Sequence, residues 1–247
     1  MRNIWTIAKR ELKQYFTSPV AYIVAFLILL ILGIIFVLNM TALNSSPFGY
    51  QSAPDVRMVI SPLAFLFLLA TPALTMRLVA EEVRMGTMEL MMTAPVRDHE
   101  FIIGKWLGAF LFILALVAVT LVYPFMLNQL ITPGIDQMLM LSGYLGVILL
   151  AAVFLSIGVS FSAIFGNQIV AFFGTLVFLI IMWWLVGAPA NILPSGGEIF
   201  SYIDLNSHFY NEFANGIISL GGLVYYLSLT LAGLIIGTTA VEMRRWK

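Results

Sequence analysis

The hydrophobic positions of this chain fall into six long runs that are separated by shorter, more polar segments. The length of each run is close to the about 20 apolar residues that an α-helix needs to cross the hydrocarbon of a bilayer. Charged residues lie between the runs or close to their ends. The pattern predicts an all-α membrane protein with six transmembrane helices, formed by a single domain over residues 1–247. The spans are expected at about residues 20–40, 60–80, 103–127, 139–163, 168–187 and 220–241.

A different pattern precedes the first run. Residues 3–17 place apolar side chains on one face of a helix and basic side chains on the other. A basic helix with aromatic residues typically lies in the membrane interface, in contact with the lipid bilayer. Ser18-Pro19 then ends the helix. An alternative is that the basic residues serve only to set topology. The candidate interfacial residues are Trp5, Lys9, Arg10, Lys13 and Phe16.

Composition supports a membrane protein and excludes a water-soluble fold. Hydrophobic residues make up 61% of the chain and charged residues 10%, whereas soluble domains have roughly 45–50% apolar and 25% charged residues. The chain has no cysteine, which excludes disulfides, thiolate metal sites and cysteine nucleophiles.

Basic residues predict the orientation of the six spans. All Lys and Arg residues except Arg57 fall in three clusters, at residues 2–13, 77–105 and 244–247. Two spans separate the first cluster from the second and four separate the second from the third, so all three lie on one side. Because basic residues are enriched on the cytoplasmic side, both termini are predicted to be cytoplasmic.

The longest connection on the opposite side covers residues 188–219. It is too polar to span the membrane, and we expect short helices that lie at the interface or dip into it. Its aromatic residues suit a position at the level of the headgroups. They are Phe200, Tyr202, Phe209, Tyr210 and Phe213.

The predicted cytoplasmic loop at residues 81–105 carries the most specific motif. An acidic pair is followed by Gly-Thr, a third acid, an apolar run, a proline and a later Gly-Lys. These residues are Glu81, Glu82, Gly86, Thr87, Glu89, Pro95, Gly104 and Lys105. The set resembles the segment between the second and third spans of ABC-2 type transporter permeases. Residues 9–22, which begin Lys9-Arg10-Glu11-Leu12, add a weaker resemblance to the gliding-motility subgroup and, more loosely, to permeases of copper-enzyme maturation.

This resemblance implies a permease subunit of an ATP-binding cassette transporter in the bacterial inner membrane, with export favoured over import. Two copies of a separate ATPase subunit, which hold ATP and Mg, would dock on loop 81–105. A second permease half, identical or homologous, would complete the transporter, and a periplasmic partner is compatible with it. The rival interpretation is a non-transporting scaffold or assembly component, in gliding machinery or metalloenzyme maturation, with the same architecture.

The loop residues are physically suited to contact a partner. Met85, Met88 and Met92 stand at helical spacing, and methionine repacks readily. Alternatively, the methionines pack under their own bundle, and the acidic pair binds Arg77 or Arg84 for structural reasons. The candidate coupling residues are Glu81, Glu82, Arg84, Met85, Gly86, Thr87, Met88, Glu89, Met92 and Pro95.

Motifs of an enzyme are missing from the sequence. No P-loop, H-E-x-x-H or G-x-S-x-G is present, and His99 and His208 are predicted on opposite sides of the membrane. We therefore expect that this chain is not an enzyme, although an enzyme acting on lipid is a remote rival, and that it binds no cofactor, metal or nucleic acid. No charged residue lies deep within a predicted span, which argues against a proton relay.

Overall fold

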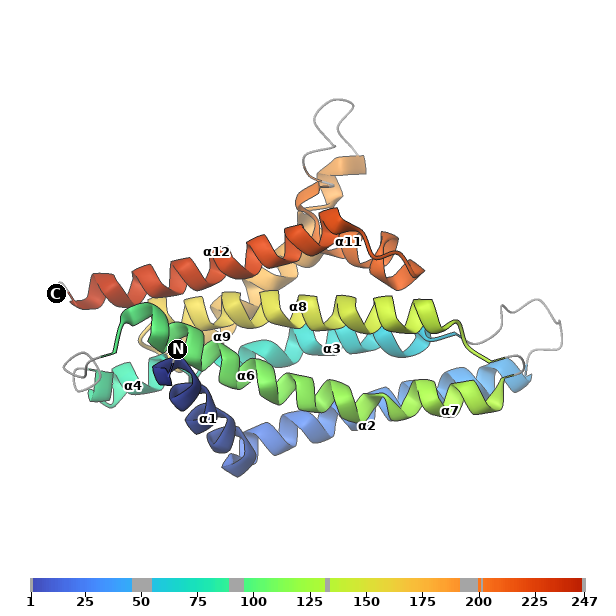
Figure 1. The fold of residues 1–247 in the computed structure, drawn as a ribbon, viewed down its shortest axis with the longest axis horizontal. Coiled ribbons are helices and arrows are strands. Elements are labelled where there is room, and N and C mark those ends of the chain that lie inside the picture. Colours follow the sequence, from blue (N-terminus) through green and yellow to red (C-terminus); the bar gives the residue numbers. More distant parts are fainter. Residues whose placement is uncertain are drawn as a thin grey trace.

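A computed structural model describes residues 2–45, 55–88, 96–131, 134–191, 200 and 202–245. Within these residues the chain is helical and forms no strand. Six helices are long and apolar enough to cross a membrane. They run side by side along the long axis of the molecule, and the prediction of an all-α membrane protein is confirmed (Figure 1).

The described residues form the following elements. The first half contains α1 (Arg2–Thr17), α2 (Pro19–Ser45), α3 (Arg57–Thr75), α4 (Ala80–Arg84), α6 (Asp98–Thr120) and α7 (Val122–Leu130). The second half contains α8 (Gln137–Ile164), α9 (Gln168–Ile180) with a π-helical turn at Ile181–Leu185, a 3-10 turn at Ala188–Asn191, α11 (Leu205–Asn211), a 3-10 turn at Phe213–Asn215 and α12 (Leu220–Arg245).

The candidate spans overlap the six predicted ranges but differ from them in detail. The second, Arg57–Arg84, consists of α3 and α4 with a turn at residues 76–79 between them. The third, Asp98–Leu130, consists of α6 and α7, which meet at Leu121. Pro62 and Pro72 both lie inside α3, which is tolerated where neighbouring helices satisfy the freed carbonyls.

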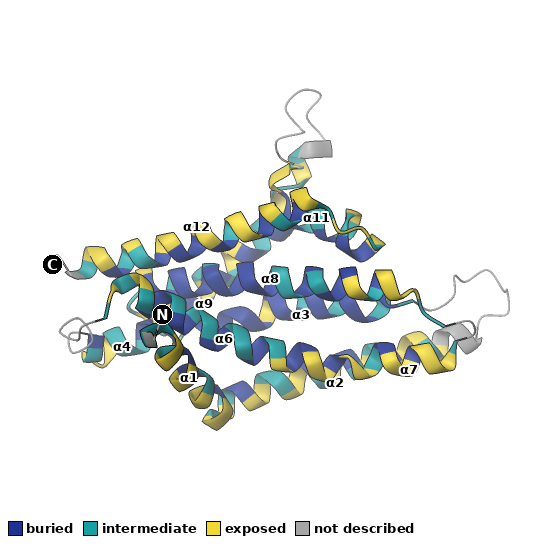
Figure 2. Cartoon of the chain, in the orientation of Figure 1, coloured by how far each residue is buried: buried dark blue, intermediate teal, exposed yellow. Residues whose placement is uncertain are grey.

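Helix α8 is the centre of the bundle. In its most apolar window 72% of the residues are buried, against 22% for the spans formed by α2 and by α9. Figure 2 shows the contrast, because α8 and α3 are mostly dark blue while α2 carries a long exposed face. That exposed face is apolar, as expected for a helix that contacts lipid rather than water.

Small residues bring α8 and α12 together. A Cβ added to Gly233 of α12 would lie 2.5 Å from the Ser156 hydroxyl of α8. The Ser160 hydroxyl donates a hydrogen bond across the interface to the Gly233 carbonyl. Close packing of glycine against serine is the usual way in which membrane helices associate, so these three residues account for the close approach of α8 and α12.

The connection at residues 188–219 differs from expectation. Phe209 and Phe213 have no exposed surface and pack in the core, so these two rings contact protein rather than lipid headgroups. Phe213 lies against Gly146 of α8, where an added Cβ would be 2.6 Å from the Phe213 Cβ. The cause is a glycine gap on α8 that accommodates an aromatic ring, which the local polarity of the segment cannot reveal. Phe200 and Tyr202 are exposed, as predicted.

Candidate functional site

The chain termini and the α4 segment lie at the same end of the bundle (Figure 1). We call this the basic end, defined by the N-terminal half of α1, by α4, by the first turns of α6 and by the last turn of α12. The three basic clusters of the sequence therefore lie together in space, as the topology prediction requires. Arg244 of the C-terminal cluster donates to the Ala163 carbonyl at 3.0 Å and the Ile164 carbonyl at 2.8 Å, and so caps α8.

Helix α1 packs tightly on the start of α6. A Cβ on Gly104 would lie 2.8 Å from the Ile7 Cβ, and one on Gly108 would lie 2.6 Å from the Glu11 Cβ. Side chains at these two positions would push the helices apart. Gly104, taken from the sequence only as half of a Gly-Lys motif, therefore has a packing role. One turn further along, Tyr15 stacks on Phe112 with ring centroids 5.1 Å apart.

The close approach of α1 and α6 creates a buried ionic triad, Glu11–Lys105–Glu82. The Lys105 ammonium lies 2.9 Å from the Glu11 Oε1 and 2.9 Å from the Glu82 Oε1. The three side chains are only 7%, 2% and 12% exposed, in the order Glu11, Lys105, Glu82. Each residue comes from a different element, namely α1, α6 and α4. The triad thus connects the predicted interfacial helix, the predicted coupling segment and the third candidate span.

The triad corrects one structural alternative for the acidic pair. Glu82 pairs with Lys105 rather than with Arg77 or Arg84. Its second oxygen, Oε2, is buried and has no hydrogen-bond partner among the described residues. Burial of a carboxylate oxygen without a hydrogen-bond partner is costly. A further N–H or O–H donor that reached this oxygen would therefore form a favourable hydrogen bond.

A serine of α8 sets the break between α3 and α4. The Ser162 hydroxyl accepts hydrogen bonds from the Val79 and Ala80 backbone N–H groups at 3.0 and 3.1 Å. It also donates to the Met76 carbonyl at 3.2 Å. One side chain therefore satisfies the backbone groups that the break leaves open, and so fixes the position of α4. The sequence motif at residues 81–105 does not include Ser162, which lies 82 positions from Ala80.

The predicted coupling residues differ in their exposure. Arg84 and Met85 are exposed, whereas Met88 is only 6% exposed and belongs to the core. Gly86 interrupts the helix with a φ of 71°, so Met85 and Met88 do not share the single helix face expected from their spacing. Glu81 and Thr87 are partly buried. The remaining candidates, Glu89, Met92 and Pro95, lie outside the described residues.

Helix α1 forms as predicted, but its apolar residues divide between two environments. Ala8 and Tyr15 are buried against the bundle, while Trp5 is 59% and Phe16 46% exposed. The cations Lys9, Arg10 and Lys13 are also exposed. The exposed aromatic and basic side chains fit the headgroup region of a membrane. The inner face instead holds the triad carboxylate Glu11.

A pocket of about 490 Å³ lies beside the triad. It is lined by residues of α1, the start of α2, the end of α3 and α4, and by Lys105 of α6. The Tyr15 hydroxyl borders it and donates a 2.8 Å hydrogen bond to the Leu74 carbonyl. Burial, assisted by the negative charge of Glu11, raises the pKa of Tyr15, so this hydroxyl remains a donor.

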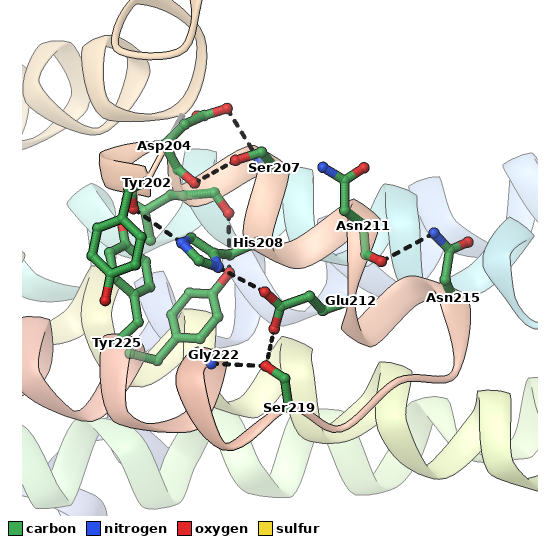
Figure 3. Close-up of polar contacts among 12 residues, drawn as sticks. Tyr202, Asp204, Ser207, His208, Asn211, Glu212, Asn215, Ser219, Gly222 and Tyr225 are labelled. Carbon is green, nitrogen blue, oxygen red and sulfur yellow. Dashed lines mark hydrogen bonds and ion pairs between the residues drawn. The ribbon is translucent and has the colours of Figure 1, made fainter. Parts of the chain in front are cut away.

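A second polar cluster lies at the opposite end of the bundle, around His208 (Figure 3). The His208 Nδ1 lies 3.0 Å from the Glu212 Oε1, and the Nε2 lies 3.0 Å from the Tyr202 carbonyl oxygen. Ser219 donates to the other Glu212 oxygen. In a nucleophilic triad the histidine is hydrogen-bonded to the serine hydroxyl. Here the serine hydroxyl is hydrogen-bonded to the Glu212 carboxylate instead. The cluster therefore joins α11 to α12 and lacks the arrangement of a serine hydrolase.

Two comparisons with known proteins bear on these observations. The family model described as ABC-2 family transporter protein matches residues 5–241. That range includes α1 from residue 5 onward, the ionic triad, the α4 segment and all six candidate spans except the last few residues of α12. The comparison with curated proteins gives no match, and thus no relative supports the gliding-motility subgroup.

Proposed function

Because the chain belongs to the ABC-2 family of transporter proteins, we propose that it is an exporter subunit whose energy enters through an ATPase docked on residues 81–105. Family membership makes the chain a transmembrane permease component of an ABC transporter, with an ABC ATPase as partner. The docking position, the direction of transport and the path of coupling are the parts that we propose.

The ionic triad is the observation that carries the proposal. Glu82 in α4 and Glu11 in α1 share the Lys105 ammonium of α6. Removing one partner from a buried ion pair costs about 3–5 kcal/mol, so a push on α4 is transmitted to α1 and α6 rather than absorbed locally. An ATPase that displaces α4 would therefore move the third span and the interfacial helix together.

The exposed end of α4 supplies the contact surface for that ATPase. Arg84 can pair with a partner acid, and the 59% exposed Met85 offers an adaptable apolar contact. Around Gly86 the space is open, since a Cβ placed there would meet no heavy atom within 4 Å. The partner backbone can therefore approach closely at this point.

We infer the rest of the assembly from the family. Two ATPase subunits, which hold ATP and Mg, act on two permease halves, identical or homologous, in the bacterial inner membrane. ATP binding favours one orientation of the bundle only to the extent that the ATPase binds that orientation more tightly. A periplasmic partner is compatible with this arrangement.

Docking is tested by copurification of the cognate ATPase with the variant Met85→Asp. The buried charge would destabilise an apolar contact, so we expect at least about tenfold less ATPase in the complex, since roughly 1.4 kcal/mol changes an equilibrium tenfold. Met243→Asp is the matched control, because Met243 is 67% exposed on α12 at the same end. Undiminished association after deletion of residues 84–92 would show that the ATPase docks elsewhere.

Coupling is tested separately from docking. Glu82→Gln removes the charge that binds α4 to Lys105 but leaves Arg84 and Met85 in place. We expect the ATPase to copurify with this variant while stimulation of its ATP hydrolysis by the permease falls several-fold. Unchanged stimulation would contradict a coupling role for the triad without affecting the docking proposal.

A further inference from the structure

The pocket beside the ionic triad combines a charged rim with an apolar floor. Its apolar lining, which we call the floor, includes Val20, Ala21, Ala73 and Leu74. Its charged lining, which we call the rim, consists of Arg10, Arg77 and Glu81 together with the three triad residues. Its volume of about 490 Å³ is within the range of roughly 300–1,000 Å³ that is typical of small-molecule sites. A ligand that fits must therefore be amphipathic, with both a cationic and an anionic group.

The position of the pocket favours a membrane lipid as that ligand. Val20 and Ala21 directly follow the Ser18-Pro19 bend at which α1 turns into the first candidate span. Ala73 and Leu74 belong to the last turn of α3. The pocket thus lies where an interfacial helix meets the hydrocarbon-spanning helices, and an acyl chain can follow the floor while the headgroup stays at the rim.

The Glu82 carboxylate indicates which kind of cationic group the ligand carries. Its Oε1 is occupied by Lys105 at 2.9 Å, whereas its Oε2 is buried without a hydrogen-bond partner in the described part of the chain. A primary ammonium carries three N–H donors and can satisfy that oxygen. A quaternary ammonium has no N–H and cannot.

The two arginines of the rim indicate which kind of anionic group the ligand carries. Arg10 and Arg77 are exposed, and no ion pair holds either of them within the residues that the structure describes. A guanidinium matches the geometry of a phosphate with two parallel N–H donors. A phosphate and a primary amine joined by a short linker are together the headgroup of an ethanolamine phospholipid.

We propose that this pocket binds a phospholipid with an ethanolamine headgroup, the amine at Glu82, the phosphate at Arg10 and Arg77, and an acyl chain along Val20 and Ala73. The lipid contacts the elements that the triad connects. This site does not depend on the proposed function, because its occupancy is a property of the chain alone.

The direct test is lipid titration of the purified full-length chain, followed by native mass spectrometry. Phosphatidylethanolamine, phosphatidylcholine and phosphatidylglycerol with identical acyl chains are compared. We expect phosphatidylethanolamine to bind at least about tenfold more tightly than the other two, since one hydrogen bond between charged groups distinguishes it. Equal affinities for the three lipids would overturn the proposal.

Two variants locate the site without touching the triad. Ala73→Phe fills the floor of the pocket, and we expect it to abolish the preference for phosphatidylethanolamine. Ala115→Phe is the matched control, because Ala115 is exposed on α6 away from the pocket. Arg77→Gln should weaken binding of all three phospholipids several-fold while the preference for the amine persists. Full selectivity in Ala73→Phe would show that the lipid binds elsewhere.

A soluble headgroup compound distinguishes the lipid from other occupants of the pocket. Soluble glycerophosphoethanolamine has the headgroup without acyl chains, and we expect it to bind at least about a hundredfold more weakly, because each buried methylene contributes to affinity. Equally tight binding would assign the pocket to a soluble metabolite instead.

Discussion

At the scale of single residues, Lys105 is the most constrained charge of the basic end. It is 2% exposed, yet it meets two carboxylates at 2.9 Å and lies 5.0 Å from the centre of the Phe101 ring. A buried lysine is stable only when it is paired. The Gly-Lys pair of the sequence motif therefore has two physical reasons: glycine lets α1 approach, and lysine neutralises the acids that this approach buries.

Replacement of Lys105 gives the first prediction at this scale. Lys105→Met leaves two carboxyl groups without a cation, and we expect it to lower the free energy of unfolding in detergent by about 3–5 kcal/mol. The triple variant Glu11→Met/Lys105→Met/Glu82→Leu should recover most of this loss, because no charge remains buried. Lys9→Met, at an exposed position of α1, is the control. A loss no greater than that of the control would mean that the triad contributes little.

At the scale of the elements, α1 differs from a helix that only lies on the membrane surface, because it also packs against α6. Its inner face is fixed by two glycines of α6, and its outer face presents Trp5 and Phe16. The α4 segment is fixed in a similar way by Ser162 of α8. Both segments that receive the proposed ATPase signal are therefore held by residues of the spans.

The glycine contact is tested by adding a single methyl group. Gly108→Ala would place a Cβ 3.0 Å from the Ala8 carbonyl as well as against Glu11, and overpacking of this kind costs about 1–3 kcal/mol. Gly221→Ala is the control, because a Cβ at that helical position meets nothing within 4 Å. It should be neutral or stabilising. Similar unfolding midpoints for the two variants would contradict close packing of α1 on α6.

At the scale of the whole molecule, the bundle has two ends of different chemistry. Both termini and three basic clusters lie at one end, and the His208 cluster lies at the other (Figure 1). The described part of the chain holds its most buried helix, α8, in the centre and leaves apolar faces of α2 and α9 exposed. This arrangement suits a membrane bundle that receives its energy from one side.

Orientation is tested with single cysteines, since the natural chain has none. Glu242→Cys marks the basic end and Asn211→Cys marks the other, and both positions are exposed. In right-side-out vesicles, a membrane-impermeant maleimide should label Asn211→Cys at once and Glu242→Cys only after permeabilisation. The opposite labelling pattern would mean that the charge distribution had been assigned to the wrong side.

The sequence alone determined the membrane class, the number of spans and the family of this protein. Helices that cross a bilayer must satisfy their backbone hydrogen bonds internally and show apolar surface to lipid, so each span is recognisable from its own residues. The grouping of basic residues likewise follows from counting along the chain. The resemblance carried by residues 9–22 and 81–105 agreed with the family match.

Only the tertiary structure decided which residues meet. Glu11 and Lys105 are 94 positions apart, and no local pattern indicates that they share a buried site with Glu82. The same holds for Phe213, which is buried because Gly146 of α8 leaves room for it. Pairing between distant elements depends on the gaps and glycines of the partner surface, so it is a property of the folded bundle, whereas each helix is a property of its own segment.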